Sequence, residues 1–463
     1  MGCSASNETL NKLKAYRMKY EEISNYLWIE YVDKCKHNEL IKTEMSKKEI
    51  KINDTIIQFD YVIKGDRPNS GFPLFILLHQ GKIGLRSENN IEYLKMKKRY
   101  FSSIKTGIIL TIKGSTDLSN MHHSNEALHF YDHIIKNMIC YCEADSNKVY
   151  LLGMGLGGNS VYQIASRYAD KFAAICIISG HSYGNSLKNL IGLPMLIQTG
   201  EMDFAYDRNK EAVKVYQKIK DYSATFGINS ECKCYIHTGK ILNIIDNKKD
   251  NKPQSIIKYP TEWLINKNEE NEMKNTNSIS FLSSHVRNPL PKKVIWDITK
   301  SGISQVKENE IILPYKKTST LLTKKDKESV NESGAGTTAS LFKSGEQGPR
   351  SQSFYWLETG NRKQEEIGSF EIIAQYDKDQ NLIFLEGQVK YIIFLLNDEM
   401  VNFSKEVKFK YKNEEKSLFL MRNSSTEKRT LYERGDIHFI FQAAVEFKRV
   451  DSGNFTVEQI DEA

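Results

Sequence analysis

Cysteine is scarce in this chain and forms no recognisable framework. There are seven cysteines in 463 residues, an odd number, with no C-x-x-C pair and none after Cys234. This usage is typical of a reducing, cytosolic environment rather than of a disulfide-stapled fold. The two C-x-C pairs would each share one face if they lay on strands, and we expect them to be core residues: Cys140/Cys142 and Cys232/Cys234. We therefore expect no metal site and no cofactor.

Long hydrophobic runs and a strong charge imbalance are also missing. No apolar run approaches the roughly 18 residues that a membrane-spanning helix needs. Lys and Arg number 65 against 58 for Asp and Glu, and the excess is spread along the chain, so we expect no nucleic-acid partner. A hydrophobic fraction of 40% and the length are enough for two or three domains with real cores.

The first six residues carry a lipidation pattern. Met1-Gly-Cys-Ser-Ala-Ser6 matches M-G-x-x-x-[ST], which predicts a myristoyl chain on Gly2. Cys3, directly after it, is placed for a palmitoyl chain. One myristoyl chain gives only marginal membrane binding, whereas two chains hold stably. We therefore predict a protein anchored to the cytosolic face of a membrane, with the lipid surface as its partner.

Residues 1–48 are interpreted as this acylated end followed by an amphipathic helix. Apolar residues recur at spacings of three and four and define one face. Packing of that face on the next domain and contact with a membrane surface both stay open. The residues of the face are Leu10, Leu13, Tyr16, Tyr20, Ile23, Leu27 and Tyr31.

Residues 49–280 alternate between strand and helix patterns. Several strand candidates are continuous apolar runs, as in parallel strands buried on both faces. This predicts a doubly wound, mainly parallel α/β sheet. The expected strands lie within 49–63 and at 73–79, 107–112, 149–152, 173–179, 194–199 and 231–237, and the expected helices at about 128–138, 159–168 and 209–222.

The stretch Val149-Tyr-Leu-Leu-Gly-Met-Gly-Leu-Gly-Gly158 combines an apolar strand, a glycine turn and a helical pattern. This is the layout of a nucleophile elbow, G-x-S-x-G, but Gly155 occupies the serine position. Phe72–Gln80, Asp145–Gly158 and Arg167–Ala174 resemble segments of α/β-hydrolases similar to polyhydroxybutyrate depolymerases and feruloyl esterases. The resemblance covers roughly residues 58–264.

That resemblance assigns roles by position. The acid of the triad would be Asp203, after the strand at 194–199, with Asp207 as a weaker candidate. The base should follow the strand at 231–237, but residues 238–246 contain no histidine. His237 comes too early, and His285 lies beyond the domain. The sequence thus keeps the acid position and lacks both nucleophile and base.

The oxyanion region is also altered. His79 ends its strand as in the resembled esterases, Gln80 stands where glycine is usual, and Leu156 follows the nucleophile position. Loss of a nucleophile or base costs about 10⁶ in kcat. We therefore predict a catalytically inactive protein that binds a protein partner or a small ester-like ligand, or acts as a scaffold.

The alternative is a membrane-attached carboxylic-ester hydrolase with a relocated nucleophile. Ser160, on the helix after the turn, and His181, after the strand at 173–179, are the candidates for recruitment. Cys176 lies in mid-strand and is expected to be core.

Residues 281–463 predict a second, antiparallel β-sandwich-like domain with a disordered, lysine- and serine-rich insertion at about 301–352. The domain is similar to one appended to some esterases, on Arg287/Pro289/Pro291, Phe354–Leu357 and Asp398–Val401. We expect 437–447 to be its closing strand. A third interpretation makes this domain and its insertion a docking platform for partners.

Overall fold

The computed structural model describes residues 7–242, 277–298, 352–450 and 454–460. The predicted acylation positions, Gly2 and Cys3, lie outside these ranges. All but the last residue of the predicted insertion at 301–352 lies outside them as well. The side chains of residues 7–21 are likewise outside the description.

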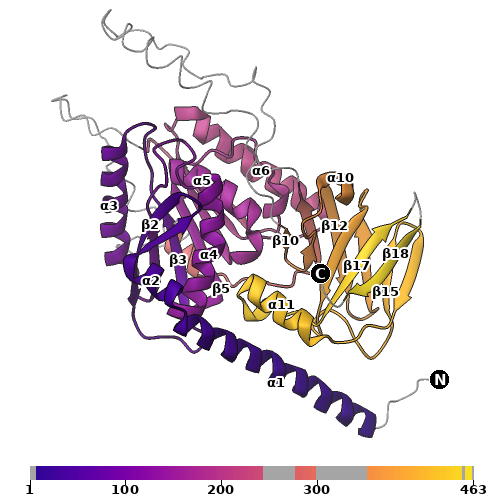
Figure 1. Ribbon diagram of the computed structural model, residues 1–463. Coiled ribbons are helices and arrows are strands. Elements are labelled where there is room, and N and C mark those ends of the chain that lie inside the picture. Colours follow the sequence, from indigo (N-terminus) through magenta and orange to yellow (C-terminus); the bar gives the residue numbers. More distant parts are fainter. Residues whose placement is uncertain (1–6, 243–276, 299–351, 451–453, 461–463) are drawn as a thin grey trace, which may run out of the picture.

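The N-terminal half is built on one eight-stranded sheet in the order β1-β2-β4-β3-β5-β6-β7-β8 (Figure 1). The pairings of β1 with β2 and of β2 with β4 are antiparallel, and all the others are parallel. The strands are β1 (Glu49–Ile52), β2 (Thr55–Lys64), β3 (Phe72–Leu78), β4 (Gly107–Ile112), β5 (Ala144–Met154), β6 (Ala174–Ile178), β7 (Met195–Gly200) and β8 (Cys232–His237). This confirms the predicted doubly wound α/β sheet.

Successive side chains of the central strands point to opposite faces, and each face has its own core. Leu74, Ile76 and Leu78 of β3 pack on one side with residues of α4, α5 and α6. Phe75 and Leu77 pack on the other side with residues of α3 and α8. The helices of this part are α2 (Glu39–Lys47), α3 (Arg86–Ser103), α4 (Asn125–Cys142), α5 (Leu156–Arg167), α6 (Arg208–Phe226) and α8 (Ser278–Ser283).

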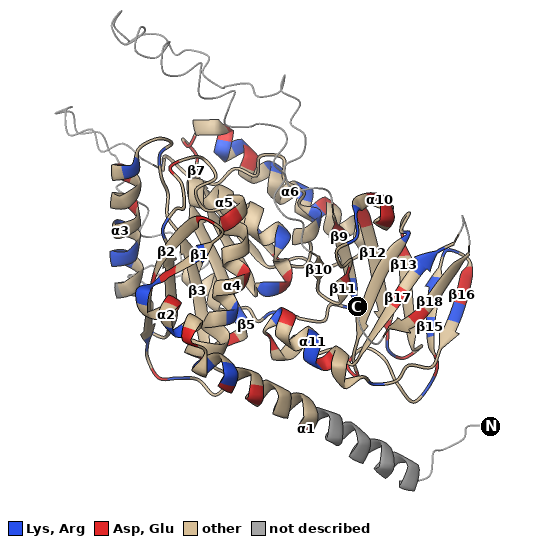
Figure 2. Ribbon diagram, viewed as in Figure 1, with Lys and Arg blue, Asp and Glu red and all other residues tan. Residues whose placement is uncertain are grey.

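Helix α3 was not expected from the sequence. It buries few large apolar side chains, chiefly Met96 and Tyr100. Its remaining surface is rich in Lys and Arg, visible as blue bands along α3 in Figure 2. That charge density hides the helical spacing of the apolar residues.

The C-terminal half is a sandwich of two five-stranded sheets, ordered β10-β11-β14-β17-β18 and β16-β15-β13-β12-β9. Aromatic side chains from the two sheets meet in its core, for example Phe394 and Phe409 with ring centroids 5.9 Å apart. All pairings are antiparallel except that of β13 with β15. The strands are β9 (Lys293–Asp297), β10 (Ser353–Phe354), β11 (Leu357–Glu358), β12 (Glu371–Asp377), β13 (Leu382–Glu386), β14 (Tyr391–Leu396), β15 (Val407–Tyr411), β16 (Glu414–Leu418), β17 (Ala443–Arg449) and β18 (Phe455–Ile460).

The expectation of a closing strand at 437–447 is wrong. That stretch begins with a 3₁₀ turn at Ile437–Phe439, and β17 starts only at Ala443. Asp436 caps the turn by accepting a hydrogen bond from the His438 N–H, which favours the turn over an extended chain. β18 follows β17 as the edge strand. The helices here are α10 (Gln364–Ile367) and α11 (Ser424–Arg434), neither of which the sequence patterns predicted.

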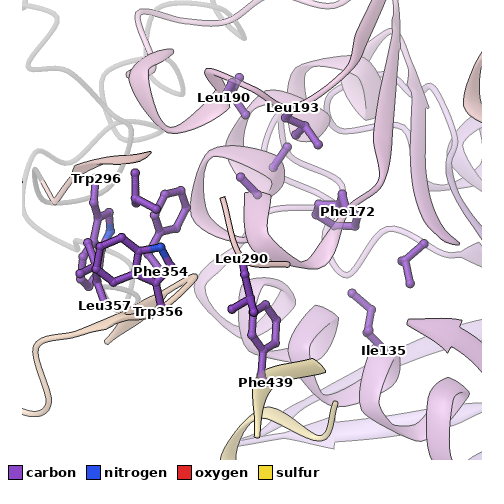
Figure 3. Packing of buried hydrophobic residues seen from close by; sticks show 14 of the residues in the cluster. Ile135, Phe172, Leu190, Leu193, Leu290, Trp296, Phe354, Trp356, Leu357 and Phe439 are labelled. Atoms are coloured by element: carbon purple, nitrogen blue, oxygen red, sulfur yellow. The ribbon is translucent and has the colours of Figure 1, made fainter. Parts of the chain in front are cut away.

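The two halves share a buried, polar and aromatic contact region. Arg434 of α11 binds Asp170 of the first half at 2.6 Å between the Nη2 and Oδ2 atoms. Leu290 and Phe439 lie together beside the first half, near the stacked rings of Trp296 and Phe354 in the sandwich (Figure 3). Arg287 binds Asp436 at 2.7 Å between the Nη2 and Oδ2 atoms, and both side chains are almost fully buried. Buried charges of this kind hold a contact only when they are paired.

Helix α1 (Asn7–His37) runs along one side of the molecule and touches both halves (Figure 1). Leu27, Tyr31 and Cys35 are buried in a cluster that includes Cys140 of α4 and Leu431 of α11. In the part of α1 whose side chains are described, the apolar face therefore packs on protein. No helix within the described ranges is long and apolar enough to cross a membrane.

Candidate functional site

The glycine turn connects β5 directly to α5 at the carboxyl edge of the sheet. Gly155 has φ 56° and ψ −118°, a conformation that residues with a side chain rarely adopt, and its N–H donates to the Ile178 carbonyl at 2.9 Å. The neighbouring glycines are needed for packing. A Cβ on Gly153 would clash with the Gly157 carbonyl, and one on Gly157 with the Leu78 carbonyl. The strained strand-to-helix turn of a nucleophile elbow is therefore present.

The space above Gly155 is filled by two side chains. A Cβ built on Gly155 would lie 3.1 Å from the Gln80 Cβ and 3.5 Å from the Leu242 Cδ2. Gln80 and Leu242 are 2% and 4% exposed, respectively. The Gln80 side chain is fixed because its Nε2 donates to the Glu92 Oε2 at 2.7 Å. A side chain on this turn would thus meet Gln80 at a tight contact and Leu242 at ordinary van der Waals contact.

His79 has a structural role beside the turn. Its Nε2 accepts a hydrogen bond from the Gly114 N–H at 3.0 Å, so its Nδ1 carries the proton and donates to the Gln80 carbonyl at 2.7 Å. Burial lowers the pKa of His79 to about 4. The imidazole is therefore neutral at pH 7, with both nitrogens in use, and it fixes the backbone of Gln80.

Asp203 lies at the acid position and is buried. The Thr199 Oγ1 donates to its Oδ2 at 3.4 Å, and the Arg208 Nη1 lies 3.8 Å from its Oδ1. Burial raises the pKa of Asp203, and the nearby Arg208 opposes the rise. Asp207, the weaker candidate, is exposed and pairs with Lys210 at 3.2 Å between the Oδ1 and Nζ atoms.

Arg208 is the residue that sequence reasoning missed. It is 1% exposed, and its guanidinium lies over the Tyr206 ring at 5.4 Å. A guanidinium stays protonated in proteins and cannot act as a general base. An arginine in the first turn of the helix after the acid was the available signal. The charge partner of Asp203 is thus a fixed cation rather than a histidine.

His237 and His285, the histidines on either side of the base position in the sequence, make other contacts. The His237 Nε2 lies 2.9 Å from the Gln198 Oε1, and burial lowers the pKa of His237 to about 4. Gln198 and Thr199 are neighbours in β7, so they point to opposite faces of the sheet. His237 therefore contacts the face opposite the Thr199–Asp203 pair. His285 pairs with Glu231 at 3.0 Å between the Nε2 and Oε2 atoms.

Ser160 contacts a histidine, and this histidine is His123 rather than His181. Its Oγ lies 2.8 Å from the His123 Nδ1 and donates to the Leu156 carbonyl at 2.9 Å. Burial lowers the pKa of His123 to about 4. His181 instead accepts from the Tyr183 N–H at 2.8 Å, and its Nε2 lies 4.0 Å from the Glu211 Oε2. Ser160 itself is fully buried.

In the described part of the chain, Cys35, Cys140, Cys142 and Cys176 are buried, whereas Cys232 and Cys234 are half-buried. Cys176 is fully buried in β6, and burial raises its thiol pKa to about 12. Cys140 and Cys142 end helix α4 and so do not form a strand pair, whereas Cys232 and Cys234 share one face of β8. The described residues contain no group of three or more His, Cys, Asp or Glu side chains placed to hold a metal ion.

Several solved esterases resemble part of the chain. A thermostable esterase aligns with 41% of this chain and 53% of its own, at 15% identity and a TM-score of 0.34. The LpqC poly(3-hydroxybutyrate) depolymerase from Bordetella parapertussis aligns over 41% of this chain and 80% of its own, at 13% identity and a TM-score of 0.35. A ferulic acid esterase aligns over 41% and 87%, at 14% identity and a TM-score of 0.29. The chain thus spans about half the length of the thermostable esterase.

No protein-family model and no curated protein matches the sequence. The strand order, the antiparallel β2 and the strained glycine turn between β5 and α5 give residues 49–237 the α/β-hydrolase fold.

Proposed function

We propose that this chain is a hydrolase-fold protein without catalytic activity that works as a binding or scaffold protein on the cytosolic face of a membrane. The observation that carries the first part is the packing of Gln80 and Leu242 over Gly155. The turn has no nucleophile, a side chain there would press on Gln80, and Asp203 faces Arg208.

The membrane attachment rests on the first residues of the sequence. A myristoyl chain on Gly2 and a palmitoyl chain on Cys3 together exceed the threshold for stable anchoring. The partner of the anchored protein would be another protein or a small ester-like ligand.

A fluorophosphonate probe tests the loss of catalysis, because only an activated serine reacts with it. We expect no labelling of the full chain and no turnover of 4-nitrophenyl acetate above buffer, with an active serine esterase as the positive control. Labelling that is equally strong in a parallel, heat-treated sample would be nonspecific. Labelling that heat abolishes would overturn the proposal.

The second candidate is an ester hydrolase that uses Ser160, and the contact between Ser160 and His123 is the observation in its favour. The full burial of Ser160 and its bond to the Leu156 carbonyl weigh against it. Ser160→Ala separates the two candidates. Only in the second would this substitution remove fluorophosphonate labelling.

Metabolic labelling with alkyne analogues of myristate and palmitate tests the anchor. We expect both labels in the native chain, loss of both in Gly2→Ala, and loss of palmitate alone in Cys3→Ser. Both variants should move from the membrane to the soluble fraction, whereas the control Ser4→Ala should not. Membrane binding that is unchanged in Gly2→Ala would contradict the proposed anchor.

A further inference from the structure

A polar cleft lies at the carboxyl edge of the sheet, between the segment that leads from β3 into α3 and the segment that follows β4. Its volume is about 210 Å³, and Gly155 is not among its lining residues. It is therefore separate from the covered turn. The lining residues that matter here are His79, Arg86, Asn89, Lys113 and Asp117.

The charge of this cleft is positive. Arg86 has no ion pair within the described residues, and the Lys113 Nζ donates only to a neutral partner, the Gln58 Oε1, at 3.0 Å. Asp117 is the one carboxylate in the lining, and its Oδ1 accepts from the Asn89 Nδ2 at 3.0 Å. The lining thus contains two cationic side chains, Arg86 and Lys113, and one anionic side chain, Asp117.

The other polar groups do not cancel this excess. His79 is neutral, because both of its ring nitrogens are engaged and burial lowers its pKa to about 4. Arg86 is also the first residue of α3, and the residue before it, Leu85, offers no side-chain cap to the helix. The N–H groups of the first turn add partial positive charge next to the guanidinium, and the Glu88 carboxylate of the same turn is paired with Lys82.

We propose that this cleft binds the phosphate group of a small ligand. Arg86 and Lys113 supply two charge-assisted hydrogen-bond donors, the pairing that phosphate recognition uses. A volume of about 210 Å³ is below the roughly 300–1,000 Å³ of pockets that enclose a drug-sized ligand. The cleft therefore fits a phosphate group itself, either on a small soluble molecule or on the headgroup of a lipid.

Calorimetric titration of the full chain with inorganic phosphate, against sodium chloride at equal ionic strength, tests the site. We expect saturable binding that weakens about tenfold in Arg86→Gln and in Lys113→Gln, because each loses one charge-assisted bond. Asp117→Asn should bind phosphate more tightly, since it removes the opposing carboxylate. Arg362→Gln, an exposed arginine in the other half of the chain, is the matched control and should bind as the native chain does.

Circular dichroism of each variant confirms that it is folded before titration. Vesicles then separate the two sources of the phosphate group, with the Gly2→Ala chain used to remove the anchor. Binding to phosphatidic acid vesicles but not to phosphatidylcholine vesicles, weakened by Arg86→Gln, identifies a lipid headgroup. Binding of inorganic phosphate without vesicle binding identifies a soluble ligand. Absence of saturable phosphate binding, or equal affinity in the native chain and both cleft variants, would overturn the proposal.

Discussion

The Gln80 side chain lies across the turn at Gly155, with its Cβ 3.1 Å from the point where a Cβ on Gly155 would stand. This spacing is tighter than ordinary van der Waals contact. Gln80 cannot easily yield, because it is buried and donates a hydrogen bond to Glu92. The glycine turn and the Gln80 side chain above it are therefore packed tightly against each other.

Gly155→Ser should destabilise the protein without creating an esterase. The positive φ and the contact with Gln80 together predict a loss of about 2–4 kcal/mol in the free energy of unfolding. Gly227→Ser is a control for positive φ alone, because Gly227 has φ 65° and ψ 31°, whereas ψ of Gly155 is −118°, and no atom lies within 4 Å of a Cβ built on Gly227. It should lose only about 1–2 kcal/mol. Urea denaturation measures the free energy of unfolding of both variants. Equal losses would show that the contact with Gln80 adds nothing to the cost of Gly155→Ser.

Arg208→Met should leave Asp203 buried without its charge partner and cost about 3–5 kcal/mol. The pKa of Asp203 is already raised by burial and should rise further in this variant. The native state then binds the Asp203 proton more tightly than the unfolded state does, so stability should fall as pH rises above the normal aspartate pKa. Denaturation across pH 4–8 measures this, with the exposed Lys210→Met as control. A double variant, Asp203→Asn with Arg208→Met, should recover much of the loss.

Arg287→Met should weaken the contact between the two halves. Burial would raise the pKa of Asp436, but Arg287 and His438 together outweigh burial and hold this pKa at about 2. The pair therefore stabilises the protein above pH 3.8, and this contribution is lost as pH falls toward about 2. We expect the variant to lose about 3–5 kcal/mol at neutral pH. A loss no larger than that of Arg362→Met, which removes an exposed pair, would refute the role of this contact.

Glu427 should make the native protein less stable as pH rises from about 4.5 to about 7. Burial raises its pKa to about 7, with a smaller contribution from Asp398, while Gln442 and Arg422 oppose the rise. In that pH window the folded state holds a proton that the unfolded state releases. Glu427→Gln should flatten the stability profile by on the order of 1–3 kcal/mol. The exposed Glu415→Gln should leave the profile unchanged, and an unaltered slope in Glu427→Gln would contradict the prediction.

The central sheet could be predicted because its strands are continuous apolar runs, as at 73–79 and 107–112. Local patterns failed where charge or turns masked them. The lysines of α3 hid its apolar spacing, and the cap supplied by Asp436 broke the strand expected at 437–447.

The glycine turn was also predictable, because its residues are consecutive. Its cover was not. Gln80 and Leu242 reach Gly155 from segments far away in the sequence, and no local pattern reports such a contact. The sequence could not predict that Arg208, rather than a histidine, lies beside Asp203, because only the folded chain shows which side chain faces the acid.

Helix α1 packs against α4 of the first half and α11 of the second, with Tyr31 meeting the Tyr432 ring edge-on at 5.4 Å. Its 31 residues correspond to a rod of about 46 Å. Because Leu27 and Tyr31 share one buried cluster with residues of α4 and α11, a displacement of α1 would disturb its packing on both halves.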